Sequence, residues 1–193
     1  GIVYSKDQKT MIAYPAGRPD TAFAIPEGVT SIGNSAFSGC ANLTQVSIPE
    51  GVTSIGSSAF YECTNLTQVS IPEGITSIGD DAFSGCTNLT QVSIPEGVTK
   101  IEYQTFHGCE SLESVTIPDA ITDIGGNAFL DCDSLKDVYF LGTKDAWQKV
   151  SIESGNEAIT ENATIHYFSE WTREKEPTCT ETGSETSTCS EAD

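Results

Sequence analysis

The stretch IPEGVTSIGSSAFYECTNLTQVS, residues 48–70, decides the fold of this chain because close copies of it follow one another along the sequence. The dipeptide Ile-Pro returns every 23 residues, starting at Ile25, Ile48, Ile71, Ile94 and Ile117. The five units cover residues 25–139. A fixed period of this length is typical of a solenoid, in which each unit buries its apolar face against neighbouring units.

The end of each unit predicts a β-strand. Val46 and Ile48 alternate with the polar residues Gln45 and Ser47, which indicates a strand with one buried face. Pro49 follows, and proline belongs at a strand end because it cannot donate to the ladder. We expect one such strand per unit, stacked into a parallel sheet, at residues 43–48, 66–71, 89–94, 112–117 and 135–140.

The middle of each unit predicts a short helical turn. Asn34 and its equivalents Ser57 and Asp80 are favourable helix N-caps. Phe37 and Cys40 then have the spacing of the inward face of one turn. The predicted fold class is therefore an α/β repeat solenoid: a right-handed, leucine-rich-repeat-like rod with one parallel strand per 23-residue coil and short helical turns on the opposite face.

Two structural ladders follow from the period, one of phenylalanines and one of cysteines. In-register coils hold equivalent side chains parallel and about 4.8 Å apart. A disulfide needs facing side chains and zinc needs a tetrahedral ligand set, so we interpret the cysteines as buried, reduced thiols. No cofactor or metal site is expected. The ladders are Phe37, Phe60, Phe83, Phe106 and Phe129, and Cys40, Cys63, Cys86, Cys109 and Cys132.

The repeat resembles the BspA-like leucine-rich repeat of bacterial surface proteins, the Treponema type of 23 residues. That pattern, C-x-x-L-x-x-V-x-I-P-x-x-V-x-x-I-G-x-x-A-F, is carried by Cys40, Leu43, Val46, Ile48, Pro49, Val52, Ile55, Gly56, Ala59 and Phe60. The unit departs from the general leucine-rich pattern because Gly51 replaces the asparagine after the strand, so the asparagine ladder is absent there. The resemblance implies a non-enzymatic protein, secreted or at the cell surface, that binds protein in adhesion.

The flanking segments predict four regions. Residues 1–24 resemble a degenerate N-terminal repeat or cap, with strands near 11–14 and 22–25, ahead of the five repeats at 25–139. Residues 140–168 predict a C-terminal cap, in which Thr143 starts a helix that buries Trp147 and residues 164–168 form a closing strand. Residues 169–193, with 16 Ser, Thr or Glu among 25, predict a linker or the start of a following module.

Cys179 and Cys189 lie off the repeat period, in the polar segment. The residues between them could form a small hairpin about Gly183 and Ser184. Whether the two thiols form a disulfide stays open, since it depends on an oxidising compartment.

The charge of the chain excludes several partners. The net charge is −19, and the repeats hold 15 acidic residues against Lys100 and Lys136. We therefore expect no nucleic-acid binding and no adhesion to an anionic membrane. No stretch reaches the length of about 20 apolar residues that a membrane span needs, and the first residues show no signal-peptide pattern.

The side chains that could carry chemistry are few. A carboxylate column after the strands could bind calcium or form a solvated acidic edge, and we favour the edge because D-x-D spacing is missing. His107 and His166 have no nucleophile or acid at a motif spacing, and no phosphate-binding or hydrolase motif occurs, so no enzyme is predicted. The column is Glu27, Glu50, Glu73, Glu96 and Asp119.

Two functions remain: protein binding in adhesion, and a structural spacer or stalk within a larger surface protein. Uniform glutamine–serine pairs on the concave face favour a spacer. In the C-terminal repeats the glutamine–serine pairs are replaced by other residues, including a carboxylate and an aromatic ring. We therefore expect a protein partner to contact Thr116, Asp137 and Tyr139. Alternatively, Tyr139 only packs beneath the cap that contains Trp147. The columns are Gln45, Gln68, Gln91, Ser114 and Asp137, and Ser47, Ser70, Ser93, Thr116 and Tyr139.

Overall fold

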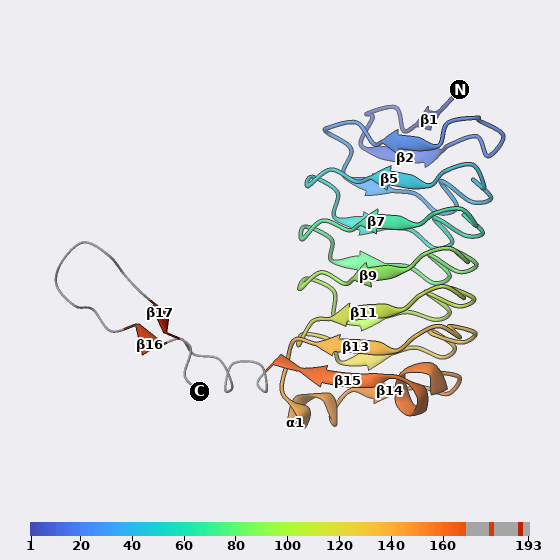
Figure 1. Ribbon diagram of the computed structural model, residues 1–193. Coiled ribbons are helices and arrows are strands. Elements are labelled where there is room, and N and C mark those ends of the chain that lie inside the picture. The colour runs from blue at the N-terminus through green and yellow to red at the C-terminus, as the bar shows by residue number, and fades with distance from the viewer. Residues whose placement is uncertain (169–177, 180–188, 191–193) are drawn as a thin grey trace.

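The structure, a computed structural model, describes residues 1–168, 178–179 and 189–190. Residues 1–168 form a rod of stacked coils with strands running across it (Figure 1). Within the repeats, hydrogen-bonded neighbours are parallel and pair residues 23 apart, such as Val46 with Val69, so the predicted parallel solenoid is confirmed. The first row of strands is β3 (Ala22–Ala24), β5 (Gln45–Ser47), β7 (Gln68–Ser70), β9 (Gln91–Ser93), β11 (Ser114–Ile117), β13 (Asp137–Phe140) and β15 (Thr164–Tyr167).

A second row of short strands makes two strands per coil, where the sequence predicted one. Val52 and Ile55 are buried, and the main-chain N–H of Thr53 donates to the Thr30 carbonyl of the preceding coil at 2.9 Å. Two residues are too few for alternation to reveal a strand. This row is β2 (Thr10–Ala13), β4 (Ser31–Ile32), β6 (Ser54–Ile55), β8 (Ser77–Ile78), β10 (Lys100–Ile101), β12 (Asp123–Ile124) and β14 (Ser151–Ile152), with β1 (Val3–Tyr4) antiparallel to β2.

Both rows are interrupted at one level of the rod. The ladders β3–β5–β7 and β9–β11–β13–β15 are separate sheets, and the second row divides between β8 and β10. At this level the rings of Phe83 and Phe106 are 5.6 Å apart, against 4.9 Å between Phe37 and Phe60. The coils therefore stack slightly more loosely between β7 and β9.

The helical turns predicted on the opposite face are not found, and these segments form hydrogen-bonded turns instead. Ser35 has a left-handed backbone with φ of 56°. The N–H groups of Ser35 and Phe37 donate to the carbonyls of Ser57 and Ala59 in the next coil, at 2.9 and 2.7 Å. An α-helix would direct them to carbonyls within the same turn. Pairing between coils thus takes the donors that a helix needs.

The phenylalanine ladder fills the centre of the rod. Phe37, Phe60, Phe83, Phe106 and Phe129 are fully buried, and neighbouring rings stack 4.9–5.6 Å apart. Glycine is required beside this core where coils approach closely. A Cβ on Gly56 would lie 2.6 Å from the main-chain nitrogen of Asn34.

Both ends of the rod are covered by atypical segments. At the N-terminal end Tyr14 stacks on Phe37, with ring centroids 5.4 Å apart. At the other end α1 (Lys144–Trp147) begins after Thr143, whose hydroxyl accepts from the N–H of Ala146 at 3.1 Å, as predicted for this cap. A π-helix, η1 (Ala158–Asn162), precedes β15.

The predicted hairpin near the C-terminus is present as a strand pair. β16 (Thr178–Cys179) runs antiparallel to β17 (Cys189–Ser190), and the backbone pairs Cys179 with Cys189. The turn expected at Gly183 and Ser184 lies outside the described residues, as does most of the linker or following module expected at residues 169–193.

Candidate binding groove

The outer face of the first row of strands is hollowed into a groove of about 610 Å³. Strand alternation produces it: Val46 and its equivalents point into the core, whereas Gln45 and Ser47 face outward. The polar residues that line the groove are Gln45, Ser47, Gln68, Ser70, Glu73, Gln91, Ser93, Ser114, Thr116 and Tyr139.

The glutamine and serine columns differ from the other polar ladders of the rod. Beside them, the hydroxyls of Thr44 and Thr67 donate to carbonyls one coil earlier, at 3.0 and 3.2 Å. In contrast, the side chains of the three glutamines and three serines on β5, β7 and β9 are exposed and make no hydrogen bond to any other described residue. Their hydrogen-bonding groups therefore face solvent in the groove.

An asparagine ladder exists, but before the strands rather than after them. The amide of Asn65 donates to the Ala41 carbonyl at 2.6 Å, and Asn88 donates to the Thr64 carbonyl at 2.7 Å. These asparagines form hydrogen bonds between neighbouring coils and lie outside the groove.

Of the three residues predicted as a binding surface, Thr116 and Tyr139 line one end of the groove, and Asp137 lies two residues before Tyr139 on β13. Thr116 on β11 pairs with Tyr139 on β13, which pairs with His166 on β15. Tyr139 is half-buried, and its ring stacks on the His166 imidazole with centroids 4.8 Å apart. Tyr139 thus packs against the C-terminal cap through His166, whereas Trp147 of the cap contacts the neighbouring Phe140, with centroids 5.0 Å apart.

His166 is a member of this surface that the sequence did not indicate. Its Nε2 lies 2.8 Å from Oδ1 of Asp137. The two residues are 29 positions apart, so no local motif could reveal the pair. Beside them is an apolar hollow of about 220 Å³, lined by Tyr139, Phe140, Leu141, His166, Tyr167 and the exposed Phe168.

His107 also lies beside a carboxylate, away from the groove. Its Nε2 is 3.4 Å from Asp131, and its Nδ1 is 3.4 Å from the Ser84 hydroxyl. This contact joins turn segments of successive coils, which is a structural role.

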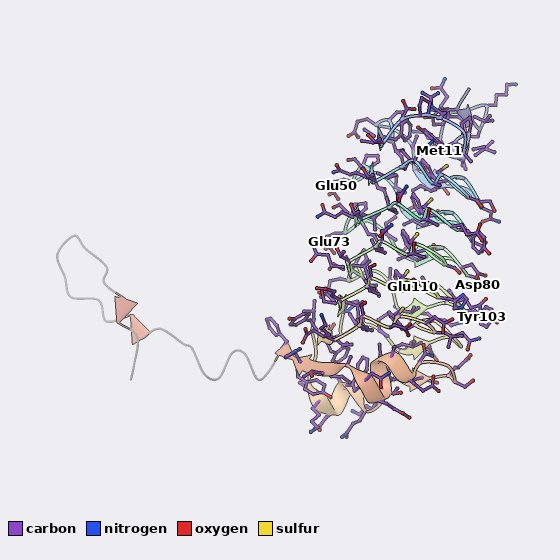
Figure 2. The ribbon with its side chains drawn as sticks, turned by 45° about the vertical axis from the view of Figure 1, so that its right-hand side comes forward. Met11, Glu50, Glu73, Asp80, Tyr103 and Glu110 are labelled. Carbon is purple, nitrogen blue, oxygen red and sulfur yellow. The ribbon has the colours of Figure 1, made fainter. Side chains whose placement is uncertain are left out.

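The acidic column forms one edge of the rod. Glu50 and Glu73 project from this edge, whereas Asp80 and Tyr103 lie at the opposite edge (Figure 2). Among the residues that the structure describes, no three acidic, histidine or cysteine side chains converge as metal ligands would. Glu50 and Glu73 are exposed along this edge.

The cysteine ladder is buried and unpaired. Cys40, Cys63, Cys86, Cys109 and Cys132 are all free thiols in the core. Burial raises the pKa of Cys86 and of Cys132 to about 12. Because the thiolate is the reactive form, the thiols of Cys86 and Cys132 are poor nucleophiles at neutral pH.

A parallel solenoid of 23-residue coils defines a leucine-rich-repeat type of repeat protein. The sequence pattern of the BspA type leucine rich repeat region matches residues 19–136 in six copies, and the chain belongs to this family.

Solved structures of bacterial leucine-rich proteins are similar to this chain. A leucine rich cell surface protein from Faecalibacterium prausnitzii is 38% identical, with a TM-score of 0.74 over 80% of this chain and 41% of that one. A leucine-rich repeat protein from Eubacterium ventriosum is 33% identical, with a TM-score of 0.68 over 71% and 37%. The leucine-rich repeat protein of T. pallidum is 32% identical, with a TM-score of 0.63 over 72% and 67%.

The chain thus spans about two fifths of the first two relatives. No functionally curated protein matches the sequence. In the described residues, no helix has the length and apolar character needed to cross a membrane.

Proposed function

We propose that this chain is a non-enzymatic, protein-binding module of a bacterial surface or secreted protein, acting in adhesion outside the cell. The observation that carries the proposal is the stacked pair of Tyr139 and His166 beside Asp137, at the end of the groove. Family membership and the cell-surface relative from F. prausnitzii support the location.

The chemistry of this end suits a protein partner. Tyrosine offers a rigid ring with a polar tip and is enriched among interface hot spots. The adjoining apolar hollow could accept an apolar side chain, and Phe168 at its margin is 56% exposed. Thr116 and Asp137 supply hydroxyl and carboxylate groups at the rim, which gives the mixed polar and apolar character of a binding surface.

The test is capture of host extracellular proteins on immobilised chain, followed by affinity measurement for a captured protein. Tyr139→Ser should weaken binding by about tenfold or more, because it removes the ring from the surface. The matched control is Tyr103→Ser, which removes an exposed tyrosine from the opposite edge of the rod. An affinity that Tyr139→Ser leaves unchanged would show that the partner binds elsewhere.

The alternative function is a spacer or stalk within a larger surface protein. The identical glutamine–serine pairs on β5, β7 and β9 favour it, because uniform coils lengthen a rod without specifying one protein partner. A spacer predicts that no host protein is captured above the level of a blank support.

A further inference from the structure

We infer that the groove over β5, β7 and β9 is a binding site for a neutral, extended β-1,4-linked glycan that lies along the axis of the rod. This goes beyond protein binding at the Tyr139 end and concerns a different ligand on a different set of coils. Three observations carry it: unpartnered polar side chains, their spacing, and their lack of charge.

The glutamine and serine columns carry the hydrogen-bonding groups that sugar hydroxyls require. Each glutamine amide has two donor hydrogens and an accepting oxygen, and each serine hydroxyl both donates and accepts. None of these six side chains bonds another described residue, in contrast to the threonine ladder beside them. Six adaptable groups thus line a groove of about 610 Å³ with their capacity unused by the fold.

The spacing of these groups selects the kind of ligand. The register aligns Gln45 with Gln68 and Ser47 with Ser70, and the rings beneath are 4.9 and 5.1 Å apart from coil to coil, widening to 5.6 Å at the level between β7 and β9. An extended β-1,4-linked glycan advances by nearly this distance per sugar, so each sugar lies over one glutamine–serine pair, with successive sugars turned over relative to each other. A peptide strand advances about 3.3 Å per residue and falls out of register after one coil.

The repeated glutamine–serine pairs of the groove favour a ligand that is itself a repeating polymer. Identical side chains on successive coils give a protein partner little to distinguish. A polymer of identical sugars instead makes contacts at regular intervals along the coils, and linked contacts strengthen binding beyond that of a single sugar.

The charge of the groove excludes acidic polysaccharides. Glu73 is the one charged side chain among the lining residues, and the whole chain carries a net charge of −19. A sulfated or uronate polymer would be repelled by this negative charge, whereas a neutral glycan experiences no such repulsion.

The experiment is calorimetric titration of the chain with defined oligosaccharides. Cellohexaose or chitohexaose should bind about tenfold or more tightly than the corresponding disaccharide, because more coils are engaged. Maltohexaose, whose α-linkages curve the chain, and a sulfated heparin hexasaccharide should bind at least about tenfold more weakly. Failure of both β-1,4-linked hexasaccharides to bind at millimolar concentration would overturn the inference, as would equal affinity for maltohexaose.

A matched pair of variants places the site on the correct sheet. Ser70→Trp fills the groove at β7 and should reduce hexasaccharide affinity by about tenfold or more. Ser77→Trp makes the same change at an exposed position of β8, on the other sheet of the same coil, and should leave the affinity within about twofold. Equal effects of the two variants would refute the placement.

If Ser70→Trp does not fold, as judged by its circular dichroism, the double variant Gln68→Ala and Gln91→Ala tests the same groove by removing two amides. It should likewise lower hexasaccharide affinity by about tenfold, and unchanged affinity would refute the site. These measurements use sugars and the middle coils. Their failure therefore leaves the protein-binding proposal, tested through Tyr139, unaffected.

Discussion

The thiol of Cys63 donates to the main-chain carbonyl of Phe37, with 3.1 Å between sulfur and oxygen, and so bonds one coil to the coil before it. The same contact recurs at 3.2 Å from Cys86 to Phe60. The repeated cysteine is therefore a hydrogen-bonding residue as well as a small apolar one. Each thiol points to a carbonyl of the preceding coil, which explains why these cysteines are free.

The five ladder thiols should resist modification in the native protein. Only the thiolate reacts readily, all five side chains are buried, and burial raises the pKa of Cys86 and of Cys132 to about 12. With a chromogenic thiol reagent near neutral pH, reaction at these five should be slow. After unfolding without reductant, at least five groups should titrate. A smaller number would contradict the free ladder.

Alkaline pH should destabilise the fold through the same thiols. An unfolded cysteine has a pKa of about 8.5, whereas burial raises that of Cys86 to about 12. Between these values the unfolded chain has lost the proton and the folded chain keeps it, so the free energy of unfolding falls as pH rises. The contribution is fully present below about pH 8.5.

Urea unfolding measured at intervals from pH 8 upward checks this. Cys86→Ala should show a shallower loss of stability than the unchanged protein. An equally steep loss in both would assign the effect to other groups.

Removal of one ring from the phenylalanine ladder should be costly. Phe83→Ala leaves a cavity between the stacked rings of Phe60 and Phe106, and we expect a loss of about 3–5 kcal/mol in the free energy of unfolding. The control, Tyr103→Ala at the exposed edge, should change it by less than about 0.5 kcal/mol. A loss below about 1 kcal/mol for Phe83→Ala would be inconsistent with a well-packed core.

The left-handed turn position can be tested at Ser58, whose φ is 55°. Ser58→Val should destabilise the fold by about 1 kcal/mol or more, because a β-branched side chain is strained in this conformation. Ser58→Gly, which tolerates positive φ, should keep or raise stability. The midpoint of urea unfolding compares the two, and a valine variant as stable as the glycine variant would contradict the turn geometry.

The buried amide of Asn156 should stabilise the C-terminal cap. Its nitrogen donates to the carbonyls of Gly125 and Glu153 at 3.0 and 2.8 Å, and its oxygen accepts from the N–H of Phe129 at 3.0 Å. Asn156→Ala leaves these buried groups unsatisfied, at a cost of about 1–3 kcal/mol. Asn162→Ala, at an exposed position, is the control and should unfold at the urea concentration of the unchanged protein.

Much of the fold could be predicted from the repeat itself. The alternation of Val46 with Gln45 and Ser47 indicated the first row of strands, and the period of 23 indicated their stacking. The cap helix after Thr143 was also evident, because an N-cap and a following aromatic residue are local signals.

Prediction from the sequence was wrong where the hydrogen-bond partner of a residue lies in another coil. Asn34 and the apolar spacing after it indicated a helix, but the N–H groups of Ser35 and Phe37 pair with the next coil. Helix propensity is a weak preference that such tertiary pairing overrides. The second strand of each coil was not predicted for the same reason. Residues 54–55 become a strand only by pairing with equivalent residues of the adjacent coils.

By itself, the sequence determined the repeating rod, since a period of apolar residues fixes which faces must be buried and how often. The tertiary structure alone decided the two candidate surfaces. It placed His166 beside Asp137, 29 residues away, and left the three glutamines and three serines of β5, β7 and β9 without a hydrogen bond to any other described residue, while neighbouring threonines bonded to the preceding coil. The physical reason is that burial follows from local pattern, whereas a polar group finds its partner through the distance between coils, which no single repeat encodes.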